Sequence, residues 1–540
     1  MGTQEPSSNE SIELSPVTLA LIDALTSTHH KKSIIEGDHY QVSQAVSFFG
    51  FAYEKMRNAI EFNEEHLIRR LAINRILRRR LAINPDGSHE GENFMKELLW
   101  GRYLPENGVS IHDVEAIQKI ITQYILFFKY VRATHHVKNI DNLGEIVMNL
   151  MSCEIEETVG KEQSEEQSAL IYYFFQILKN KVAIEAVDDT KKDMYFYAAV
   201  EQGYAKNDKP FILYHLFVLK YGTLAGKTDS QIQTLASEFS SFMTEASEII
   251  RNTYTDMLVK FVKKQVPPFK ILHDIIRKHQ GGVKDILSNS EKLRKEVELI
   301  CQEKYKQASQ KLRNAAVRSI TYIFLTKMVF VLLIEIPLSK LLFDDMEISS
   351  VAINTLLPPM LMGVIVSVIT PPSGKNTERI YGRIIDIVDA DESFENQKTV
   401  IAKKTNERRP GLIFAFTLLY LLSFSLVFGG IYFLLDVLGF NIISKAIFIF
   451  FISVVTFFAY RIRQTAKEYV LESNTNIVIS FVTFIFLPIL YLGKLFSEQV
   501  AKINIFIIFF DYLIEAPFKF IIEIVEEWTK FLRDRKDELV

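Results

Sequence analysis

The sequence predicts an all-α protein in two parts, a soluble N-terminal helical domain followed by a bundle of transmembrane helices. Hydrophobic residues make up 48% and charged residues 24% of the 540 residues, yet nearly all long apolar runs lie after residue 318. Before that point, apolar residues recur at spacings of three and four between short polar turns, as in amphipathic helices. Strand-like alternation is nearly absent, so we expect no sheet.

Three segments are expected before the membrane. Residues 1–14 are expected to be disordered, and they lack the basic and apolar regions of a signal peptide. Residues 15–289 are expected to form one or two helical domains in the cytoplasm. No Gly or Pro occurs from residue 290 until Pro337, so residues 290–318 are expected to form a connecting helix that continues into the membrane.

The transmembrane bundle is expected to occupy residues 319–525. Its apolar runs of spanning length are 319–339, 348–370, 411–435, 442–460, 476–493 and 503–525. The last run either spans the membrane or lies in its interface, so we expect six spans, with five as the alternative. Lys and Arg are concentrated in the loop 371–410, the tail 526–540 and the other segments that are inside if the N-terminus is inside. Both termini are therefore expected in the cytoplasm and the spans in the plasma membrane.

Charges within the apolar runs are the strongest functional signal, because a charge is costly at the membrane centre. The candidates are Lys327 and Glu335 in the first span and Asp511, Glu515 and Lys519 in the last. Lys327 and Glu335 are eight residues apart, so we expect that they do not touch. Either each one reaches its own interface, or Lys327 pairs with Asp511 or Glu515 across the bundle.

Prolines interrupt two of the expected spans. Pro358 and Pro359 lie in the second span and Pro488 in the fifth. Such breaks free backbone carbonyls, which transporters use to bind ions, although they also occur as simple kinks. Spans two to five show no buried polar cluster of Asn, Gln or Asp in the sequence pattern, so a coupled transporter lacks its usual ligands.

One helix of the N-terminal domain is strongly basic, with Arg69, Arg70, Arg75, Arg78, Arg79 and Arg80. One hypothesis is a patch for anionic lipid headgroups or phosphates. The favoured interpretation is a solvated face paired with Glu61, Glu64 and Glu65. The segment 379–388 of the cytoplasmic loop, RIYGRIIDIV, is expected either to be a short helix that lies along the headgroups with its arginines toward anionic lipid, or to be an ordinary connector.

No catalytic or metal-binding motif is present. The sequence contains no GxxxxGK[ST], HExxH, CxxC or GxSxG, so we expect no enzyme activity, no cofactor and no metal. The two cysteines, Cys153 and Cys301, give no support for a disulfide framework and favour a reducing compartment. A net charge of -3 gives no reason to expect a nucleic-acid partner.

Several stretches together resemble a family of uncharacterised multi-span membrane proteins from small-genome bacteria of the candidate phyla. They are EEHLIRRLAINRILRRRL, ENFMKELLWGRYLPENG, LLIEIP, LLPPMLM and DYLIEAPFKFIIEIVEEW. The resemblance covers most of the chain and implies a bacterial integral membrane protein. It implies no activity, cofactor or binding residue.

The expected function is that of a membrane-embedded scaffold or interaction protein. Its partners would be a cytoplasmic protein of unknown identity, anionic lipid headgroups and other copies of the chain. The alternative is a channel or transporter whose pathway runs between the first and last spans along Lys327, Asp511 and Glu515.

Overall fold

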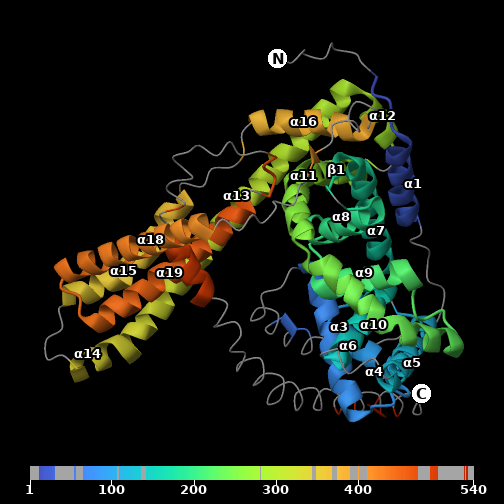
Figure 1. Ribbon diagram of the computed structural model, residues 1–540, viewed down its shortest axis with the longest axis horizontal. Helices are drawn as coiled ribbons and strands as arrows, with labels where there is room; N and C mark the ends of the chain where they lie inside the picture. The colour runs from blue at the N-terminus through green and yellow to red at the C-terminus, as the bar shows by residue number, and fades with distance from the viewer. Residues whose placement is uncertain are drawn as a thin grey trace.

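Two helical bodies are joined by a single long helix (Figure 1). The computed structural model describes residues 11–30, 65–105, 109–134, 142–185, 187–279, 281–342, 348–367, 374–389, 399–400, 410–466, 468–471 and 487–496, with a few isolated positions besides. Within these residues, three helices are long and apolar enough to cross a membrane, at Ser290–Leu341, Phe414–Val437 and Ile442–Tyr460. Nearly all described elements are helices, so the predicted all-helical class is confirmed.

The first body, called here the N-terminal body, contains fourteen helical elements in the described ranges. They are α1 (Pro16–His30), η1 (Glu65–Leu67), α3 (Ile68–Ile83), α4 (Glu90–Trp100), α5 (Ile111–Ala133), α6 (Leu143–Val159), α7 (Lys161–Leu178), η3 (Lys179–Lys181), α8 (Asp189–Gly203), α9 (Lys209–Tyr221), α10 (Asp229–Arg251), α11 (Thr253–Lys278), α12 (Val283–Ser288) and α16 (Gly374–Asp389). In the described ranges, β1 (Val182–Ala183) and β2 (Thr399–Val400) form a parallel pairing of two residues each, and there is one isolated bridge besides.

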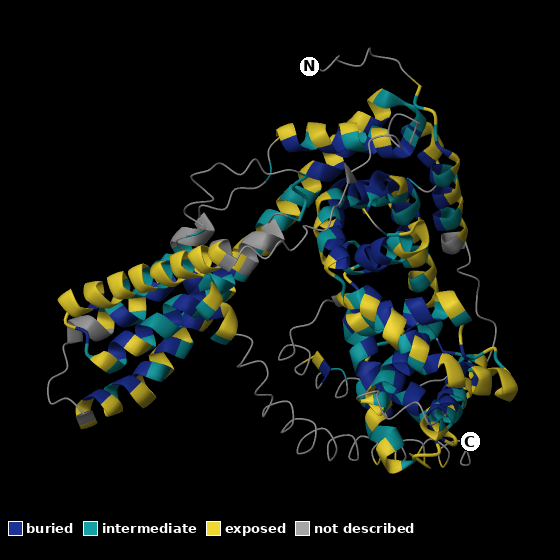
Figure 2. Ribbon diagram, in the orientation of Figure 1, coloured by how far each residue is buried: buried dark blue, intermediate teal, exposed yellow. Residues whose placement is uncertain are grey.

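The second body, called here the apolar bundle, surrounds the distal part of the long helix. Its elements are the end of α13 (Ser290–Phe330), a π-helical turn (Val331–Glu335), α14 (Ile336–Leu342), α15 (Ile348–Ser367), α18 (Pro410–Val437), α19 (Ile442–Ala466) and the short helix Leu487–Phe496. Exposed residues run along the whole of α18 (Figure 2), and among them are Phe414, Leu426 and Phe433. An apolar surface of this extent is typical of a membrane contact.

Side-chain caps fix where several helices begin. Ser110 forms a capping box with Asp113 at the start of α5, and Asp208 accepts from the backbone N–H of Phe211 at the start of α9. Asn289 accepts from the backbone N–H of Lys292, so α13 begins at residue 290, as the sequence predicts. From there the chain is helical for 52 residues, through the segment 290–318 and beyond it.

The expected disorder of residues 1–14 is wrong for the part that the structure describes. Ser11 forms an antiparallel bridge with Asn289, and the backbone N–H of Ile12 donates to the carbonyl of Ser288 at 2.9 Å. The backbone N–H of Ser15 then donates to the carbonyl of Val388 at 3.0 Å. These hydrogen bonds tie the start of the described chain to α12 and α16.

Helix α16 corrects both interpretations of the segment 379–388. Ile380, Ile384 and Ile387 are fully buried in the core of the N-terminal body, where α16 packs against α11 and α13 (Figure 1). The helix is therefore neither a loose connector nor a helix whose apolar face lies in lipid headgroups. It brings the segment between α15 and α18 back to the N-terminal body.

The segment after α19 also returns to the N-terminal body. The side chain of Asn376 in α16 donates to the carbonyl of Tyr469 at 2.8 Å and accepts from the backbone N–H of Leu471 at 2.9 Å. Lys270 of α11 pairs with Glu468 at 2.5 Å. The helices α13 and α15, and then α18 and α19, thus leave and re-enter at the same end of the apolar bundle.

Candidate functional site

The structure brings together two of the predicted charges. The Nζ atom of Lys327 lies 3.7 Å from the Oε2 atom of Glu335, and neither side chain has any exposed surface. The expectation that these two side chains do not touch is therefore wrong. Asp511, Glu515 and Lys519 lie outside the described residues, and so does the predicted pairing of Lys327 with Asp511 or Glu515.

The π-helical turn explains how Lys327 and Glu335 meet. In a regular helix each residue advances about 100°, so side chains eight residues apart point about 80° away from one another. The turn Val331–Glu335 accommodates one extra residue, which makes the eight-residue spacing behave like one of seven, within about 20° of a common face. Both side chains consequently face the interior of the apolar bundle.

Glu335 is also hydrogen-bonded to the two neighbouring helices. Its Oε1 atom accepts from the side-chain amide of Asn354 in α15 at 2.6 Å and from the hydroxyl of Ser444 in α19 at 2.6 Å. Both partners are almost fully buried. The expectation concerned clusters of Asn, Gln or Asp within spans two to five, and it did not consider that Glu335 of the first span could form a buried cluster with one Asn and one Ser from two of those spans.

Hydrogen bonds continue from this cluster toward the end of the apolar bundle farthest from the N-terminal body. Asn441 accepts from the backbone N–H of Ser444 at 2.8 Å and donates to the hydroxyl of Ser339 at 3.0 Å. Toward the other end, the Nζ atom of Lys327 lies 4.5 Å from the ring centroid of Phe451. Polar and charged side chains thus form a series from Ser339 to Lys327 inside the apolar bundle.

Some hydrogen-bonding capacity in this cluster is unused. Lys327 Nζ, Glu335 Oε2 and Asn354 Oδ1 are buried atoms that form no hydrogen bond within the described part of the chain. Burying such atoms costs free energy unless a water or an ion satisfies them. The arrangement can therefore stabilise one packing of the helices, or it can accept a water or a small ion among them.

The prolines that were predicted to interrupt two spans lie within helices. Helix α15 continues through Pro358 and Pro359, which are both buried, so they do not interrupt this span. Pro358 still lacks the N–H that would otherwise bond the carbonyl of Asn354, one turn earlier. Pro488 is buried in the helix Leu487–Phe496. That helix lies so close to α19 that a Cβ atom at Gly493 would overlap the carbonyl of Ser453.

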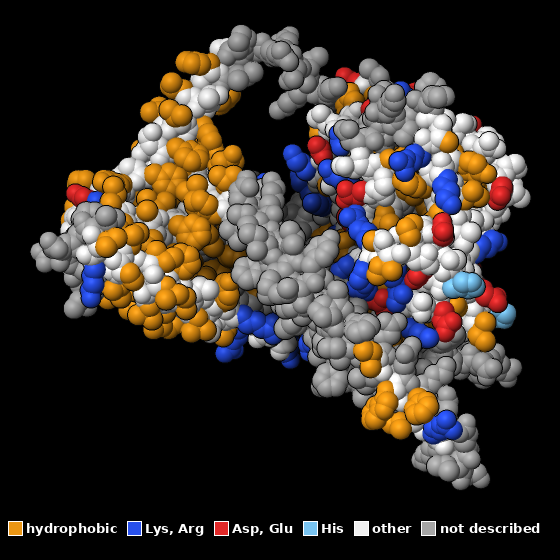
Figure 3. Space-filling view, turned by 90° about the horizontal axis from the view of Figure 1, so that it is seen from below, with side chains coloured by type: hydrophobic (Ala, Val, Ile, Leu, Met, Phe, Trp, Pro, Cys, Tyr) orange, Lys and Arg blue, Asp and Glu red, His pale blue; other side chains and the backbone are white. Residues whose placement is uncertain are grey.

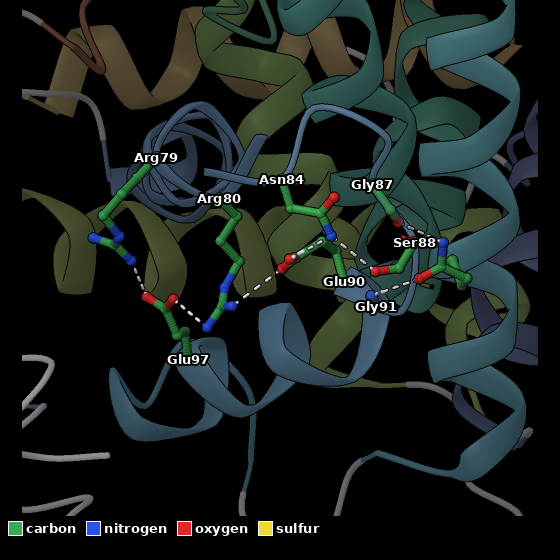
Figure 4. Close-up of polar contacts among 9 residues, drawn as sticks. Arg79, Arg80, Asn84, Gly87, Ser88, Glu90, Gly91 and Glu97 are labelled. Atoms are coloured by element: carbon green, nitrogen blue, oxygen red, sulfur yellow. Dashed lines mark hydrogen bonds and ion pairs between the residues drawn. The ribbon is translucent and has the colours of Figure 1, made fainter. Parts of the chain in front are cut away.

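The arginine helix, α3, faces carboxylates of its neighbours and not a lipid surface. Figure 4 shows Glu97 between Arg79 and Arg80, with Glu90 on the other side of Arg80. The remaining pairs are Arg69 with Glu156, Arg70 with Asp208, Arg75 with Glu54, and Arg78 with Glu145. Apart from Arg78, these arginine side chains are at most 23% exposed.

Both interpretations of α3 are therefore corrected. An outward-facing anion patch does not form, because the guanidinium groups bond carboxylates of other segments and are largely buried. A solvated face is wrong as well, because five of the six side chains are largely buried and their described partners come from α4, α6, Glu54 and Asp208. The predicted partners Glu61 and Glu64 and the side chain of Glu65 lie outside the described part of the chain.

A histidine held between two carboxylates was not predicted. His215 of α9 contacts Glu157 of α6 through Nε2 at 2.8 Å and Glu201 of α8 through Nδ1 at 2.9 Å. Asn207 donates to the second oxygen of Glu201 at 2.6 Å. The sequence signal was that His215 interrupts the apolar run 211–225, but nothing in the sequence indicates its partners.

The charge of His215 is set by these carboxylates. Burial acts to lower the pKa of His215, but the carboxylates of Glu201 and Glu157 outweigh burial and raise that pKa to about 10. Burial likewise acts to raise the pKa of Glu201, and the contact with His215 holds that pKa below its usual value. At neutral pH this is therefore a buried cation between two carboxylates.

His215 lies in the wall of a cavity of about 770 Å³ in the N-terminal body. The cavity lies between α3, α6, α7, α9 and α11, and its lining includes both charged and neutral polar side chains. Within the described residues, no group of three or more His, Cys, Asp or Glu side chains could hold a metal ion.

Comparison of the chain with protein-family models, with curated proteins and with solved structures finds no match. The geometry described above therefore carries the functional argument by itself.

Proposed function

We propose that this protein is an integral membrane protein that holds a helical domain against the cytoplasmic face of the plasma membrane as a scaffold for a protein partner. The observation that carries the proposal is the return of the chain to the N-terminal body after both α15 and α19. Because α16 and residues 468–471 complete the packing of that body, the domain is fixed to the membrane part at several points and not tethered by α13 alone.

The proposed topology has six spans and both termini inside. The two returns to the N-terminal body support an even number of crossings before residue 374 and again before residue 468. The concentration of Lys and Arg in the same segments supports the cytoplasm as their side. The last two spans of the proposal include residues that the structure does not describe, so they rest on the sequence.

Cysteine labelling tests the proposed topology. A cysteine at Val437, which is 71% exposed at the far end of α18, is expected to react with a membrane-impermeant maleimide in intact cells. A cysteine at the exposed Lys375 in α16 is expected to react only after the cells are permeabilised. The native Cys153 and Cys301 are both buried and serve as the background. Equal labelling of both variants in intact cells would contradict the topology.

A channel or transporter is the second candidate, and the unused polar atoms of Lys327, Glu335 and Asn354 favour it. The polar series from Ser339 to Lys327 would form the part of such a pathway that is farthest from the N-terminal body. In this second candidate Lys327 pairs with Glu335, whereas the sequence predicted Asp511 or Glu515, which lie outside the described residues.

Flux and crosslinking together separate the two candidates. In proteoliposomes, the scaffold is expected to give no proton, sodium or potassium flux above that of protein-free vesicles. In cells, photo-crosslinking residues at Ile83 and Leu219, which are exposed on the N-terminal body, are expected to give discrete adducts, with the exposed polar Gln233 as control. If the vesicles show ion flux that Glu335→Gln abolishes, and if no crosslinked adduct forms in cells, the transporter becomes the favoured candidate in place of the scaffold.

A further inference from the structure

The cavity of the N-terminal body has a basic mouth. Its lining includes Arg69, Arg102, Lys206 and Lys270 against the carboxylates of Glu156 and Glu157. The positive charge of His215 in the same wall is offset by Glu157 and Glu201. Lys206 and Lys270 differ from it, because their carboxylate partner, Glu468, comes from a separate segment that an incoming anion could displace.

A carboxylate from another part of the chain already lies between two of these cations. Glu468, just after α19, is 2.5 Å from the Nζ atom of Lys270 and 3.8 Å from that of Lys206. Burial acts to raise the pKa of Glu468, but the charges of Lys270, Lys206 and Lys311 outweigh burial and hold that pKa below its usual value. The mouth of the cavity thus binds an anionic oxygen group in the structure itself.

The rest of the wall offers hydrogen-bond donors. The first turn of α7 borders the cavity at Gly160 and Gln163, and α7 has no side-chain cap there. Backbone N–H groups at a helix N-terminus carry partial positive charge. Gln167 and Asn207 also line the cavity; Gln167 donates to Asn207 and Asn207 to Glu201, so each side-chain amide has a second N–H besides the one already used. Cations together with neutral donors suit the several oxygens of a phosphate better than a single carboxylate.

The mouth lies close to the membrane surface of the proposed topology. The apolar span of α19 ends at Tyr460 and the helix itself at Ala466, about 9 Å further along its axis, and Glu468 follows two residues later. A headgroup layer is about 5 to 8 Å thick on each side of the hydrocarbon. In Figure 3, Lys and Arg side chains gather on the part of the N-terminal body nearest the apolar bundle.

We propose that this cavity binds a phosphate group, carried by a lipid headgroup or by a soluble phosphate ester, and that Glu468 holds Lys206 and Lys270 when the phosphate is absent. The incoming phosphate displaces the Glu468 carboxylate from the two lysines. Binding therefore loosens the contact between the segment after α19 and α11. The proposal does not depend on which protein the scaffold holds.

The experiment uses the full chain in maltoside micelles, which carry no phosphate. One arm titrates inorganic phosphate and glycerol 3-phosphate and measures binding by calorimetry, and the other adds phosphatidylglycerol to the micelles and follows the thermal unfolding midpoint. A response in the first arm identifies a soluble phosphate ester as the source, and a response only in the second identifies a lipid headgroup.

Two variants with opposite expected effects keep the test decisive. Lys206→Gln with Lys270→Gln is expected to weaken binding at least about tenfold, because two charge-assisted contacts are lost. Glu468→Gln is expected to tighten binding several-fold, because it removes the competing carboxylate. The control, Lys263→Gln with Lys264→Gln, changes exposed lysines of α11 that do not line the cavity and is expected to have no effect.

The proposal is overturned by either of two results. One is no response to phosphate in either arm. The other is a lower unfolding midpoint in the lysine and glutamate variants alike, with unchanged phosphate binding, which would show that the Lys270–Glu468 contact is structural only.

Discussion

Lys327→Met is expected to lower the free energy of unfolding of the apolar bundle by about 3 to 5 kcal/mol, because it leaves a buried carboxylate without its cation. Glu335 would keep its hydrogen bonds from Asn354 and Ser444. Those neutral donors stabilise a negative charge less than an ammonium group does. Unfolding in mixed micelles, followed by circular dichroism, measures the change.

The double variant Lys327→Met with Glu335→Gln supplies the comparison. A neutral pair of similar size is expected to recover most of the lost stability, because removing both charges also removes the cost of burying them. Glu335→Gln alone is expected to destabilise the bundle, since it leaves Lys327 unpaired. Lys340→Met, at an exposed position of the same helix, is the matched control. A double variant no more stable than Lys327→Met would show that the two side chains are not coupled.

The stability of the N-terminal body is expected to fall as the pH rises from about 6.5 to about 10. The pKa of His215 is raised from its ordinary 6.5 to about 10 in the folded protein, so its stabilisation is complete below 6.5 and is lost as the pH passes 10. The total loss is of the order of 3 to 5 kcal/mol. Burial raises the pKa of the neighbouring Tyr214, so this phenol stays neutral over the same range.

Chemical denaturation at a series of pH values measures this loss. His215→Gln is expected to be less stable at pH 7 and to show a flatter dependence between pH 7 and 10. His112→Gln, which replaces a histidine that is 91% exposed, is expected to retain the dependence of the original chain. If the original chain and His215→Gln show the same slope, His215 does not carry the charge assigned to it.

The parts of the fold that depend on local pattern could be predicted from the sequence. The start of α13 at residue 290 follows from the cap at Asn289 and from the stretch without Gly or Pro. The buried face of α16 could also be seen as an apolar stripe containing Ile380 and Ile384. What covers that stripe could not be predicted, because α11 lies about one hundred residues earlier in the chain and is brought to α16 by the fold.

The polar contacts within the site were harder to predict, for two physical reasons. A regular helix places Lys327 and Glu335 on different faces, and the π-helical turn that aligns them has no signature in the residues themselves. The arginines of α3 have carboxylates nearby in sequence, yet Arg69 and Arg70 bond Glu156 and Asp208, which are far away along the chain. Sequence spacing indicates which charges exist but not which of them the tertiary fold brings together.

The continuous helix Ser290–Leu341 belongs to both hydrophobic interiors, with Ile300 buried in one and Ile323 in the other. The rotation of this helix about its own axis is therefore fixed at each end by the core into which that end packs. One additional residue between these two isoleucines would turn one end by about 100° and shift it by about 1.5 Å relative to the other. The length of this segment is therefore constrained by the need to keep both ends in register with their separate cores.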